Sequence, residues 1–252
     1  MKLLDCTLRD AGYYSNWHYS DSDIQQYCEI INDLKIDIIE IGYRNPPSEA
    51  FRGSLYYCPS IVLKKFDQIL DKSVEKYLMI DFKAVTNHDE NIKRIQSVKN
   101  YIDGIRFAVD ADQTKGLNNF IKSVTELDLK VSINLMYGHK YLSGDLSFDD
   151  IKNKIDIKNI EILSVVDSYG CLLPDDVVKL MKKTSECFPN TLLGYHGHNN
   201  LNLALSNSIA AIESGVEVVD STLGGLGRGA GNLRTEDSIL ALNHYHKKMC
   251  DS

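Results

Sequence analysis

Eight short runs rich in β-branched residues recur along the chain, and each is followed by a segment with helical character. Strict alternation of strand and helix predicts a parallel sheet, because parallel neighbours need a crossover of the kind that a helix provides. Eight such units in 252 residues predict a closed (β/α)8 barrel, a fold that typically takes about 250 residues. The expected strands are residues 3–6, 36–41, 77–80, 104–108, 130–135, 160–166, 192–195 and 216–220.

The segments between these runs carry helix signals. We expect Asp21 or Ser22 to cap the first long helix, and Pro174 to open a later one at the position that proline favours. The longest irregular stretch, residues 43–60, follows the second strand and would lie on the catalytic face of a barrel as a lid. The expected helices are residues 21–34, 174–187, 201–214 and 233–248.

The strand sequences favour a closed barrel over an open sheet. Residues 38–41 and 162–166 are nearly continuous apolar runs, as in strands covered on both faces. An open doubly wound sheet would place a glycine-rich turn after the first strand, and residues 5–12 contain no such cluster. No linker or charge run divides the chain, so a single α/β barrel domain is expected over residues 1–252.

Composition and charge narrow the classes of function. Hydrophobic residues make up 43% of the chain and charged residues 25%, which permits a large core. The net charge of -7 and the absence of a Lys/Arg block argue against a nucleic-acid partner. No apolar run is long enough to span a membrane and no secretory signal opens the chain, so a cytoplasmic location is expected. Six scattered cysteines lack metal-ligand spacing and are interpreted as inert thiols.

A candidate metal site follows from polar residues at the predicted strand ends, where barrel active sites are built. His196 and His198 are two residues apart on a strand, so both imidazoles point the same way into the barrel mouth. With Asp10, which follows the first strand, they would make a two-imidazole, one-carboxylate site for a divalent ion. The alternatives are two histidines that alternate by chance, and an Asp10 that caps a helix.

A glycine-rich segment, residues 224–231, follows the last strand. Glycines such as Gly227 and Gly229 let the backbone approach a substrate closely, and loops after strands seven and eight are the usual phosphate site of this fold. A tight turn before the last helix would explain the same glycines. A barrel of another class that uses phosphates therefore stays open at this point.

Taken together, five segments resemble the DRE-TIM metallolyase superfamily, which includes HMG-CoA lyase, and most closely its 4-hydroxy-2-oxovalerate aldolase branch. They occur in the order that the family shows and span nearly the whole chain. The segments are LDCTLRD (4–10), EIG (40–42), DSYG (167–170), HGHNN (196–200) and GLGRGAGN (225–232).

The resemblance implies roles for individual residues. Asp10, His196 and His198 would ligate Mn2+ or Mg2+, with Co2+ or Zn2+ also tolerated, and Asn232 would be a fourth ligand or support the site. Arg9 would grip a 2-oxo acid and stabilise enolate charge. The residue that would help hold the substrate carboxylate is Ser168.

The chain departs from the family pattern where a base is needed. Ala11 replaces the Glu or Gly of the opening motif, and Tyr13 stands where the aldolases place a catalytic histidine. The unshifted pKa of histidine, about 6.5, suits proton transfer better than that of tyrosine. His18, on the same loop, and His139, after the fifth strand, are therefore the candidate bases.

The resemblance implies a metal-dependent aldolase that acts through the enolate of pyruvate or a related 2-oxo acid, with an aldehyde as the second small molecule. Two alternatives remain: a Claisen enzyme that condenses an acyl-CoA with a 2-oxo acid, and a metal-binding barrel without catalysis. We expect a homo-oligomer. A dehydrogenase partner is not expected, because the helical extension that docks it in the aldolases is missing.

Overall fold

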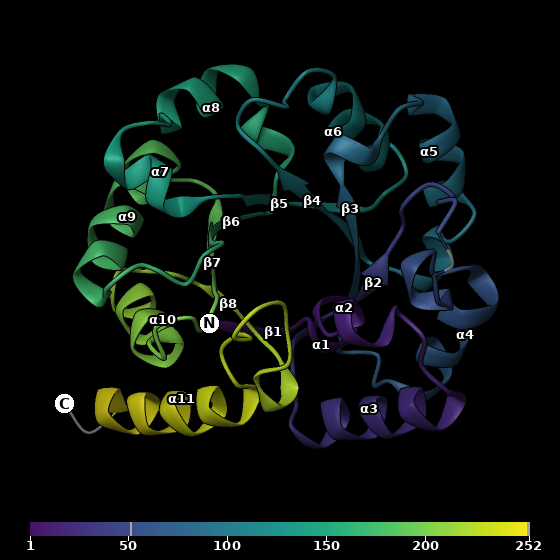
Figure 1. Ribbon diagram of the computed structural model, residues 1–252, viewed down its shortest axis with the longest axis horizontal. Coiled ribbons are helices and arrows are strands. Elements are labelled where there is room, and N and C mark those ends of the chain that lie inside the picture. Colours follow the sequence, from purple (N-terminus) through teal and green to yellow (C-terminus); the bar gives the residue numbers. More distant parts are fainter. Residues whose placement is uncertain (51, 251–252) are drawn as a thin grey trace.

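The computed structural model describes residues 1–50 and 52–250, with side chains up to residue 243. Its centre is a closed barrel in which each strand is hydrogen-bonded in parallel to the next and β8 pairs with β1 (Figure 1). The predicted (β/α)8 barrel is therefore confirmed. The strands are β1 (Lys2–Asp5), β2 (Ile38–Tyr43), β3 (Glu75–Asp81), β4 (Gly104–Val109), β5 (Lys130–Leu135), β6 (Ile162–Asp167), β7 (Leu192–Gly197) and β8 (Val218–Ser221).

Helices surround the barrel (Figure 1), and the four that were expected differ from the observed ones by no more than three residues at either end. The helices are α1 (Thr7–Asp10), α2 (Gly12–Ser15), α3 (Asp21–Asp33), α4 (Ser60–Ile69), α5 (His88–Gln96), α6 (Leu117–Thr125), α7 (Gly138–Ser143), α8 (Phe148–Lys154), α9 (Pro174–Cys187), α10 (Ala204–Glu213) and α11 (Thr235–Cys250). Short 3-10 turns occur at Ser54–Tyr56, Phe82–Ala84, Lys99–Tyr101, Ile157–Asn159 and Leu223–Gly225. Within the described residues, none of the helices has the length and apolar character that crossing a bilayer requires.

Local capping explains where two of these helices begin. Pro174 is the first residue of α9, as predicted. The predicted cap of α3 was wrong, because Ser20 precedes the helix and caps it. Its hydroxyl accepts a hydrogen bond from Asp23 N at 3.1 Å, and the Asp23 carboxylate accepts one from Ser20 N at 2.7 Å. This reciprocal arrangement satisfies two amide donors that the helix itself leaves free.

The chain leaves strand geometry directly after β1. A single helical turn, α1, follows, and all four of its side chains are buried. Successive side chains diverge by about 100° on a helix, whereas on a strand they point to opposite faces. Arg9 and Asp10 can therefore both reach the mouth of the barrel although they are adjacent in the sequence.

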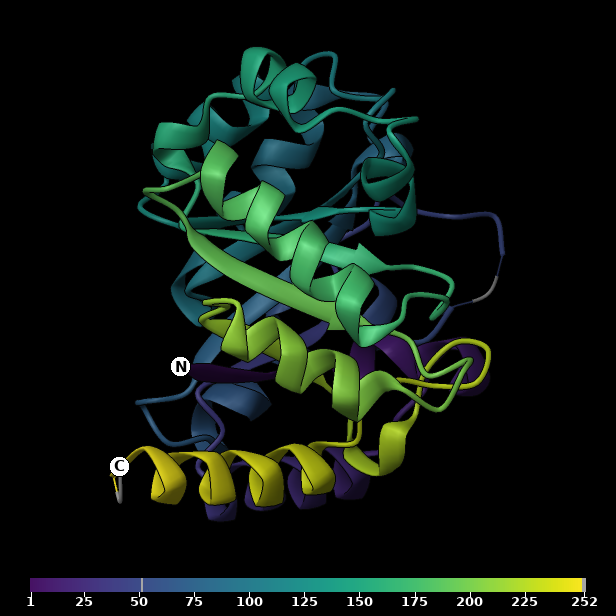
Figure 2. The same cartoon turned by 90° about the vertical axis from the view of Figure 1, so that its left-hand side faces the viewer.

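The carboxyl ends of the strands lie on one side of the molecule, together with the glycine-rich loop after β8 and the segment after β2 (Figure 2). The segment after β2 was expected to be a lid, and its described part is held at several points. Gly53 N donates to Asn16 O at 2.8 Å, and Arg44 Nη2 donates to Arg94 O at 2.9 Å. These contacts position the segment beside the opening of the barrel.

The opposite, amino-terminal end of the barrel is filled. Lys2 and Lys130 make ion pairs with Glu75 at 2.6 and 2.8 Å. Fully buried side chains above them form an inner layer, so the interior of the barrel is a packed core at this end. The layer consists of Leu4, Cys6, Ile38, Tyr77, Ile162 and Val218.

Gly104 of β4 provides the test of this packing. A Cβ at this position would lie 2.3 Å from Cε1 of the Tyr77 ring, which is fully buried. We expect Gly104→Ala to lower the free energy of unfolding by about 1–3 kcal/mol, because the ring must shift within a filled layer. Urea denaturation followed by circular dichroism measures the loss. Tyr77→Leu makes room, so the double variant should lose less than the sum of the two single variants, and additive losses would contradict the clash.

Candidate metal centre

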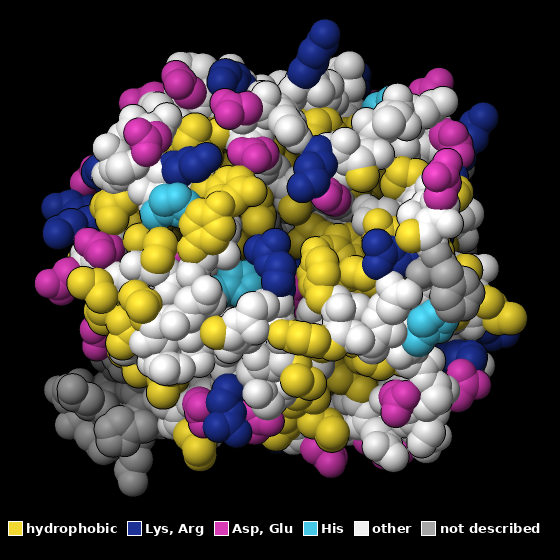
Figure 3. Space-filling view, viewed as in Figure 1, with side chains coloured by type: hydrophobic (Ala, Val, Ile, Leu, Met, Phe, Trp, Pro, Cys, Tyr) yellow, Lys and Arg dark blue, Asp and Glu magenta, His cyan; other side chains and the backbone are white. Residues whose placement is uncertain are grey.

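A polar cavity of about 120 Å3 opens at the carboxyl ends of the strands. In the space-filling view of this side of the molecule, a basic side chain and a histidine lie next to each other in the central hollow (Figure 3). Every member of the candidate triad contributes to the cavity wall. Its lining residues include Arg9, Asp10, Tyr13, Tyr43, Met79, Asp81, Lys83, Asp110, Gln113, Asn134, Tyr137, Val166, His196, His198 and Arg228.

Asp10, His196 and His198 converge on one point. A ligand atom from each lies within 4.8 Å of the others, and all three residues are buried. His196 belongs to β7 and His198 follows it, so the two-residue period of the strand directs both rings into the cavity. The spacing is short enough for one ion to touch all three side chains.

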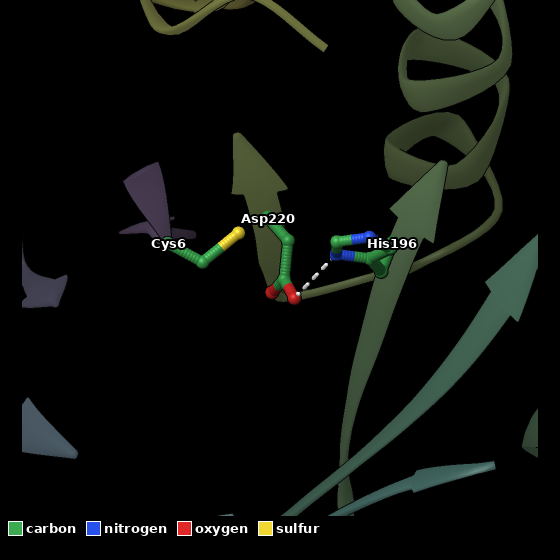
Figure 4. A group of neighbouring side chains, drawn as sticks. All are labelled: Cys6, His196 and Asp220. Carbon is green, nitrogen blue, oxygen red and sulfur yellow. Dashed lines mark hydrogen bonds and ion pairs between the residues drawn. The ribbon is translucent and has the colours of Figure 1, made fainter. Parts of the chain in front are cut away.

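Hydrogen bonds orient the two imidazole rings. His196 Nδ1 lies 3.0 Å from Asp220 Oδ2 (Figure 4), and His198 Nδ1 lies 3.3 Å from the carbonyl oxygen of Gly231. With Nδ1–H donating in each ring, Nε2 carries the lone pair that a metal needs. Carboxylate–histidine pairs of this kind are the usual support of metal-ligating imidazoles.

The protonation states also suit a metal. Burial and the neighbouring His196 ring lower the pKa of His198 to about 4, so its imidazole is neutral at pH 7. Burial by itself would raise the pKa of Asp10, but the charge of Arg9 and the hydrogen bond from Asn232 outweigh it and the pKa is lowered. Both groups therefore present the deprotonated form that coordination requires.

Asn232 closes the site from the glycine-rich loop. Its Nδ2 donates to Asp10 Oδ2, and its buried Oδ1 has no hydrogen-bond partner among the described residues. Gly227 makes this approach feasible, because a Cβ there would lie 2.3 Å from Asn232 Nδ2 and 2.9 Å from Asp10 Oδ2. Gly227 is thus packed against the triad. Gly229, by contrast, lines an adjoining pocket.

A buried network of charges lies beneath the triad. Arg9 donates through Nη1 to Asp10 Oδ1 at 2.6 Å and through Nε to Glu40 Oε1. Glu40 Oε2 accepts from Arg106 Nη1 at 3.1 Å, and Arg106 Nη2 donates to Asp220 Oδ2 at 2.9 Å. Since Asp220 also holds His196, the ion pairs connect Arg9 to the far side of the candidate metal site.

Arg106 and Asp220 were not among the residues predicted from the sequence, and Glu40 appeared there only as part of a motif. A signal was available, because each is a charged residue within a predicted apolar strand and on the inward-facing side. Such residues are almost never fully buried without partners. Three of them in one barrel predict an internal ion network, although not which residues pair.

A second group of potential ligands, Cys6, His196 and Asp220, shares one histidine with the triad (Figure 4). Burial raises the pKa of the Cys6 thiol well above its usual value, so the thiol stays protonated and donates to Ser221 O at 3.5 Å. Asp220 is already paired with Arg106. This group therefore supports the His196 ring, and a metal ion would be held on the Asp10 side by Asp10, His196 and His198.

The two histidines proposed as bases lie away from the cavity wall. His18 is exposed on the loop after α2, and His139 is on α7 with its ring centroid 5.1 Å from that of Tyr169. The cavity is lined instead by Tyr13 and Tyr43, whose Oη atoms are 3.2 Å apart. Burial raises the pKa of Tyr43 well above its usual value, so this phenol remains protonated.

Ser168, proposed to hold the substrate carboxylate, is also placed outside the first cavity. Its Oγ accepts a hydrogen bond from Tyr137 N at 2.9 Å. It lines a second pocket of about 380 Å3 that shares Tyr137, His198 and Arg228 with the first cavity. The two pockets therefore adjoin, and Ser168 would contact a part of the substrate beyond the triad.

Comparisons with curated proteins identify relatives over almost the whole chain. An oxaloacetate decarboxylase of Mycobacterium tuberculosis is 28% identical over 244 residues, which cover 95% of this chain and 69% of the relative. A 4-hydroxy-2-oxovalerate aldolase of Geobacillus genomosp. 3 is 25% identical over 246 residues, which cover 96% of this chain and 70% of the relative. Both relatives are longer than this sequence, and both are lyases by name.

The structural and family comparisons agree. The N-terminal domain of a provisionally assigned aldolase from Bacteroides vulgatus superposes with a TM-score of 0.91 at 34% identity, and the match covers 98% of this chain and 81% of that one. A family model described as HMGL-like matches residues 1–250. The chain belongs to the HMGL-like family, as the resemblance of its motifs to the DRE-TIM metallolyases indicated.

Proposed function

We propose that the protein is a divalent-metal-dependent carbon–carbon lyase, an aldolase that acts on pyruvate or a related 2-oxo acid. The observation that supports this most directly is the convergence of Asp10, His196 and His198 in one cavity with the buried guanidinium of Arg9. Two imidazoles and one carboxylate with open positions suit a catalytic ion. A fixed cation beside them suits a reaction in which negative charge develops on oxygen.

The residues present fit a divalent cation. The buried network of Arg9, Arg106, Asp10, Glu40 and Asp220 contains two guanidinium groups against three carboxylates, which leaves one negative charge. The unpartnered Oδ1 of Asn232 is a further oxygen donor next to the triad. Mn2+ and Mg2+ match the oxygen ligands, and Co2+ or Zn2+ would accept the imidazoles. When bound, such an ion supplies Lewis-acid polarisation of the oxygen atoms of a 2-oxo acid.

Arg9 stabilises the developing negative charge. Its Nε and Nη1 atoms are held by Glu40 and Asp10, which leaves Nη2 to contact the substrate. Burial alone would lower the pKa of Arg9, but these two carboxylates raise it, so the positive charge is permanent. A guanidinium fixed in this way needs little reorganisation as the oxyanion of an enolate forms.

The cavity offers phenols for proton transfer. Tyr13 is three residues after Asp10, and its Oη is within hydrogen-bond distance of Tyr43 Oη. Tyr43 stays protonated because burial raises its pKa, so it can support Tyr13 by donating a hydrogen bond. We assign proton transfer at the substrate to Tyr13 Oη, and leave His18 and His139 as the alternatives.

Decarboxylation is a second candidate activity, because one relative is named oxaloacetate decarboxylase. Loss of carbon dioxide from a 3-carboxylated 2-oxo acid leaves the same enolate as aldol cleavage. The same cation at Arg9 would stabilise it. The two reactions differ only in the group that departs.

Metal binding is predicted to depend on the histidines. The purified protein should bind one Mn2+ per chain, and His196→Ala or His198→Ala should abolish binding and activity, because the remaining donors cannot complete the site. Isothermal titration calorimetry of metal-stripped protein measures the stoichiometry. His88→Ala is the control, since His88 is on α5 and outside the cavity. Full occupancy in a His196→Ala/His198→Ala protein would contradict this ligand set.

Enolate formation is predicted to depend on Arg9. With Mn2+, the wild-type protein should exchange the methyl protons of pyruvate with deuterium from the solvent, as followed by NMR. Arg9→Lys should slow the exchange by roughly 10^2 or more while pyruvate affinity falls less, because lysine keeps the charge but loses the planar fork. No exchange of pyruvate or 2-oxobutyrate by the wild type would rule out the simple pyruvate enolate.

The same assay tests the assignment of proton transfer. Tyr13→Phe should slow the exchange by roughly 10^2, the usual range for loss of a positioned acid–base group. His18→Ala and His139→Ala are the comparison, because both rings lie outside the cavity wall. A larger loss in either of them than in Tyr13→Phe would return the role to that histidine.

A further inference from the structure

The pocket beside the metal triad has a distinct electrostatic character. It has a volume of about 380 Å3 and shares wall residues with the first cavity, among them His198 and Arg228. Its other lining residues include Ser168 and Asn200, and none of the lining residues is acidic. A substrate held at the triad would extend into this space, called here the Arg228 pocket.

Arg228 is the one lining cation of the two pockets that has no carboxylate partner among the described side chains. By contrast, Arg9 is paired with Asp10 and Glu40, and Lys83 lies 3.6 Å from Asp81. The chain has 35 acidic residues against 28 basic ones, so acidic partners are abundant. An unpaired guanidinium at the mouth of a cavity is available to an anionic ligand.

The loop that carries Arg228 is held in place. Tyr14 Oη donates to Gly229 O at 3.1 Å, which ties the loop to α2. On its other side, Asn199 N donates to Gly231 O at 2.9 Å, and Asn232 N donates to Gly225 O at 3.0 Å. The guanidinium therefore projects from a backbone anchored at both ends, and its position does not depend on the side chain alone.

The other polar groups that line the Arg228 pocket complement an anion. Ser168 Oγ already accepts from Tyr137 N, so its own hydrogen is free to donate into the pocket. The amide group of Asn200, another lining residue, can add a second donor. A guanidinium, a hydroxyl and an amide around one space match the acceptor oxygens of a carboxylate or a phosphate.

We propose that the Arg228 pocket binds a second anionic group of the substrate, so that the preferred substrates are 2-oxo acids with a carboxylate on the half that lies beyond the breaking bond. This assignment rests on the proposed aldolase function. In the cleavage direction, the C3–C4 bond of a 4-hydroxy-2-oxo diacid breaks and its electron pair remains on C3 as the enolate. The hydroxyl proton on O4 passes to the acid–base group, C4 becomes an aldehyde that carries the distal carboxylate, and a proton returned to C3 gives the 2-oxo acid.

The charge balance favours cleavage of such diacids over decarboxylation. A carboxylate that departs as carbon dioxide loses its negative charge, so a cation that grips it stabilises the ground state and opposes the reaction. The distal carboxylate of a 4-hydroxy-2-oxo diacid keeps its charge throughout. Arg228 can therefore bind it without a penalty in the transition state.

The test compares three substrates with Mn2+-loaded protein. The three substrates differ in the group at the distal end. That group is an uncharged methyl in 4-hydroxy-2-oxopentanoate, a carboxylate in 4-hydroxy-2-oxoglutarate and a phosphate in 4-hydroxy-2-oxo-5-phosphooxypentanoate. We expect kcat/KM for 4-hydroxy-2-oxoglutarate to exceed that for 4-hydroxy-2-oxopentanoate by tenfold or more. Arg228→Gln should remove most of this preference through KM, and Arg228→Lys should restore part of it. Arg234→Gln, a change of an exposed arginine outside both pockets, should keep the wild-type ratio.

The outcomes separate the pocket from the reaction. A preference for the phosphate substrate that is lost in Arg228→Gln would support an anion-binding pocket and would assign phosphates to it in place of carboxylates. Equal values for all three substrates, or a preference untouched by Arg228→Gln, overturns the proposal even if pyruvate exchange proceeds.

Calorimetric binding of 2-oxoglutarate and 2-oxobutyrate provides a readout independent of turnover. One outcome is that the protein binds 2-oxoglutarate more tightly than 2-oxobutyrate through Arg228 and yet neither cleaves the three substrates nor exchanges pyruvate protons. That result would support the anion-binding pocket and contradict the proposed aldolase function. Equal binding of the two acids by wild type and by Arg228→Gln would contradict the proposal that this pocket binds an anionic group.

Discussion

The buried ion network of Arg9, Glu40, Arg106 and Asp220 is the interaction on which the site depends. Arg106 is completely buried within the barrel and is paired with Glu40 on one side and Asp220 on the other. Removing one member of a buried pair leaves an unpaired charge and costs about 3–5 kcal/mol. The network therefore constrains the barrel interior, and the orientations of Arg9 and His196 follow from it, since each is held by one of its carboxylates.

The barrel provides the geometry that this network needs. Parallel strands place all their carboxyl ends at one end, so residues from β2, β4, β7 and β8 can meet those of the turn after β1 although they are far apart in the sequence. The filled layer around Tyr77 closes the other end and excludes water from below. In such an interior, charge–charge interactions are stronger than in solvent, which suits both metal ligation and stabilisation of an enolate.

The lower part of the site is built on the barrel strands, and its rim is made of loops. The triad and Arg9 stand on β7, on the turn after β1 and on the network below them. Asn232 and Arg228 come from the loop after β8, which Tyr14 and Asn199 anchor. This division is common in barrels, where the strands hold the chemistry that a family shares and the loops determine which substrates fit.

Much of this arrangement could be predicted from the sequence. The alternation of eight strands and helices predicted the closed barrel, because the spacing of apolar residues along each segment indicates which of its faces are buried. Residues at strand ends predicted the convergence of Asp10, His196 and His198, since the two-residue period of a strand sets the direction of both imidazoles. The helical turn Thr7–Asp10, which lets the adjacent Arg9 and Asp10 reach the same cavity, came from the structure.

The pairing of the charges was decided by the tertiary structure alone. Glu40, Arg106 and Asp220 lie on three strands, and the local sequence does not specify which inward-facing side chains lie at the same level of the barrel. The same holds for the candidates for proton transfer: sequence distance favoured His18, whereas the folded chain brings Tyr13 and Tyr43 to the cavity. The physical reason is that periodicity along one chain specifies the face on which a side chain lies. Its neighbours across the barrel are set by strand register and loop path, which depend on the packing of the whole molecule.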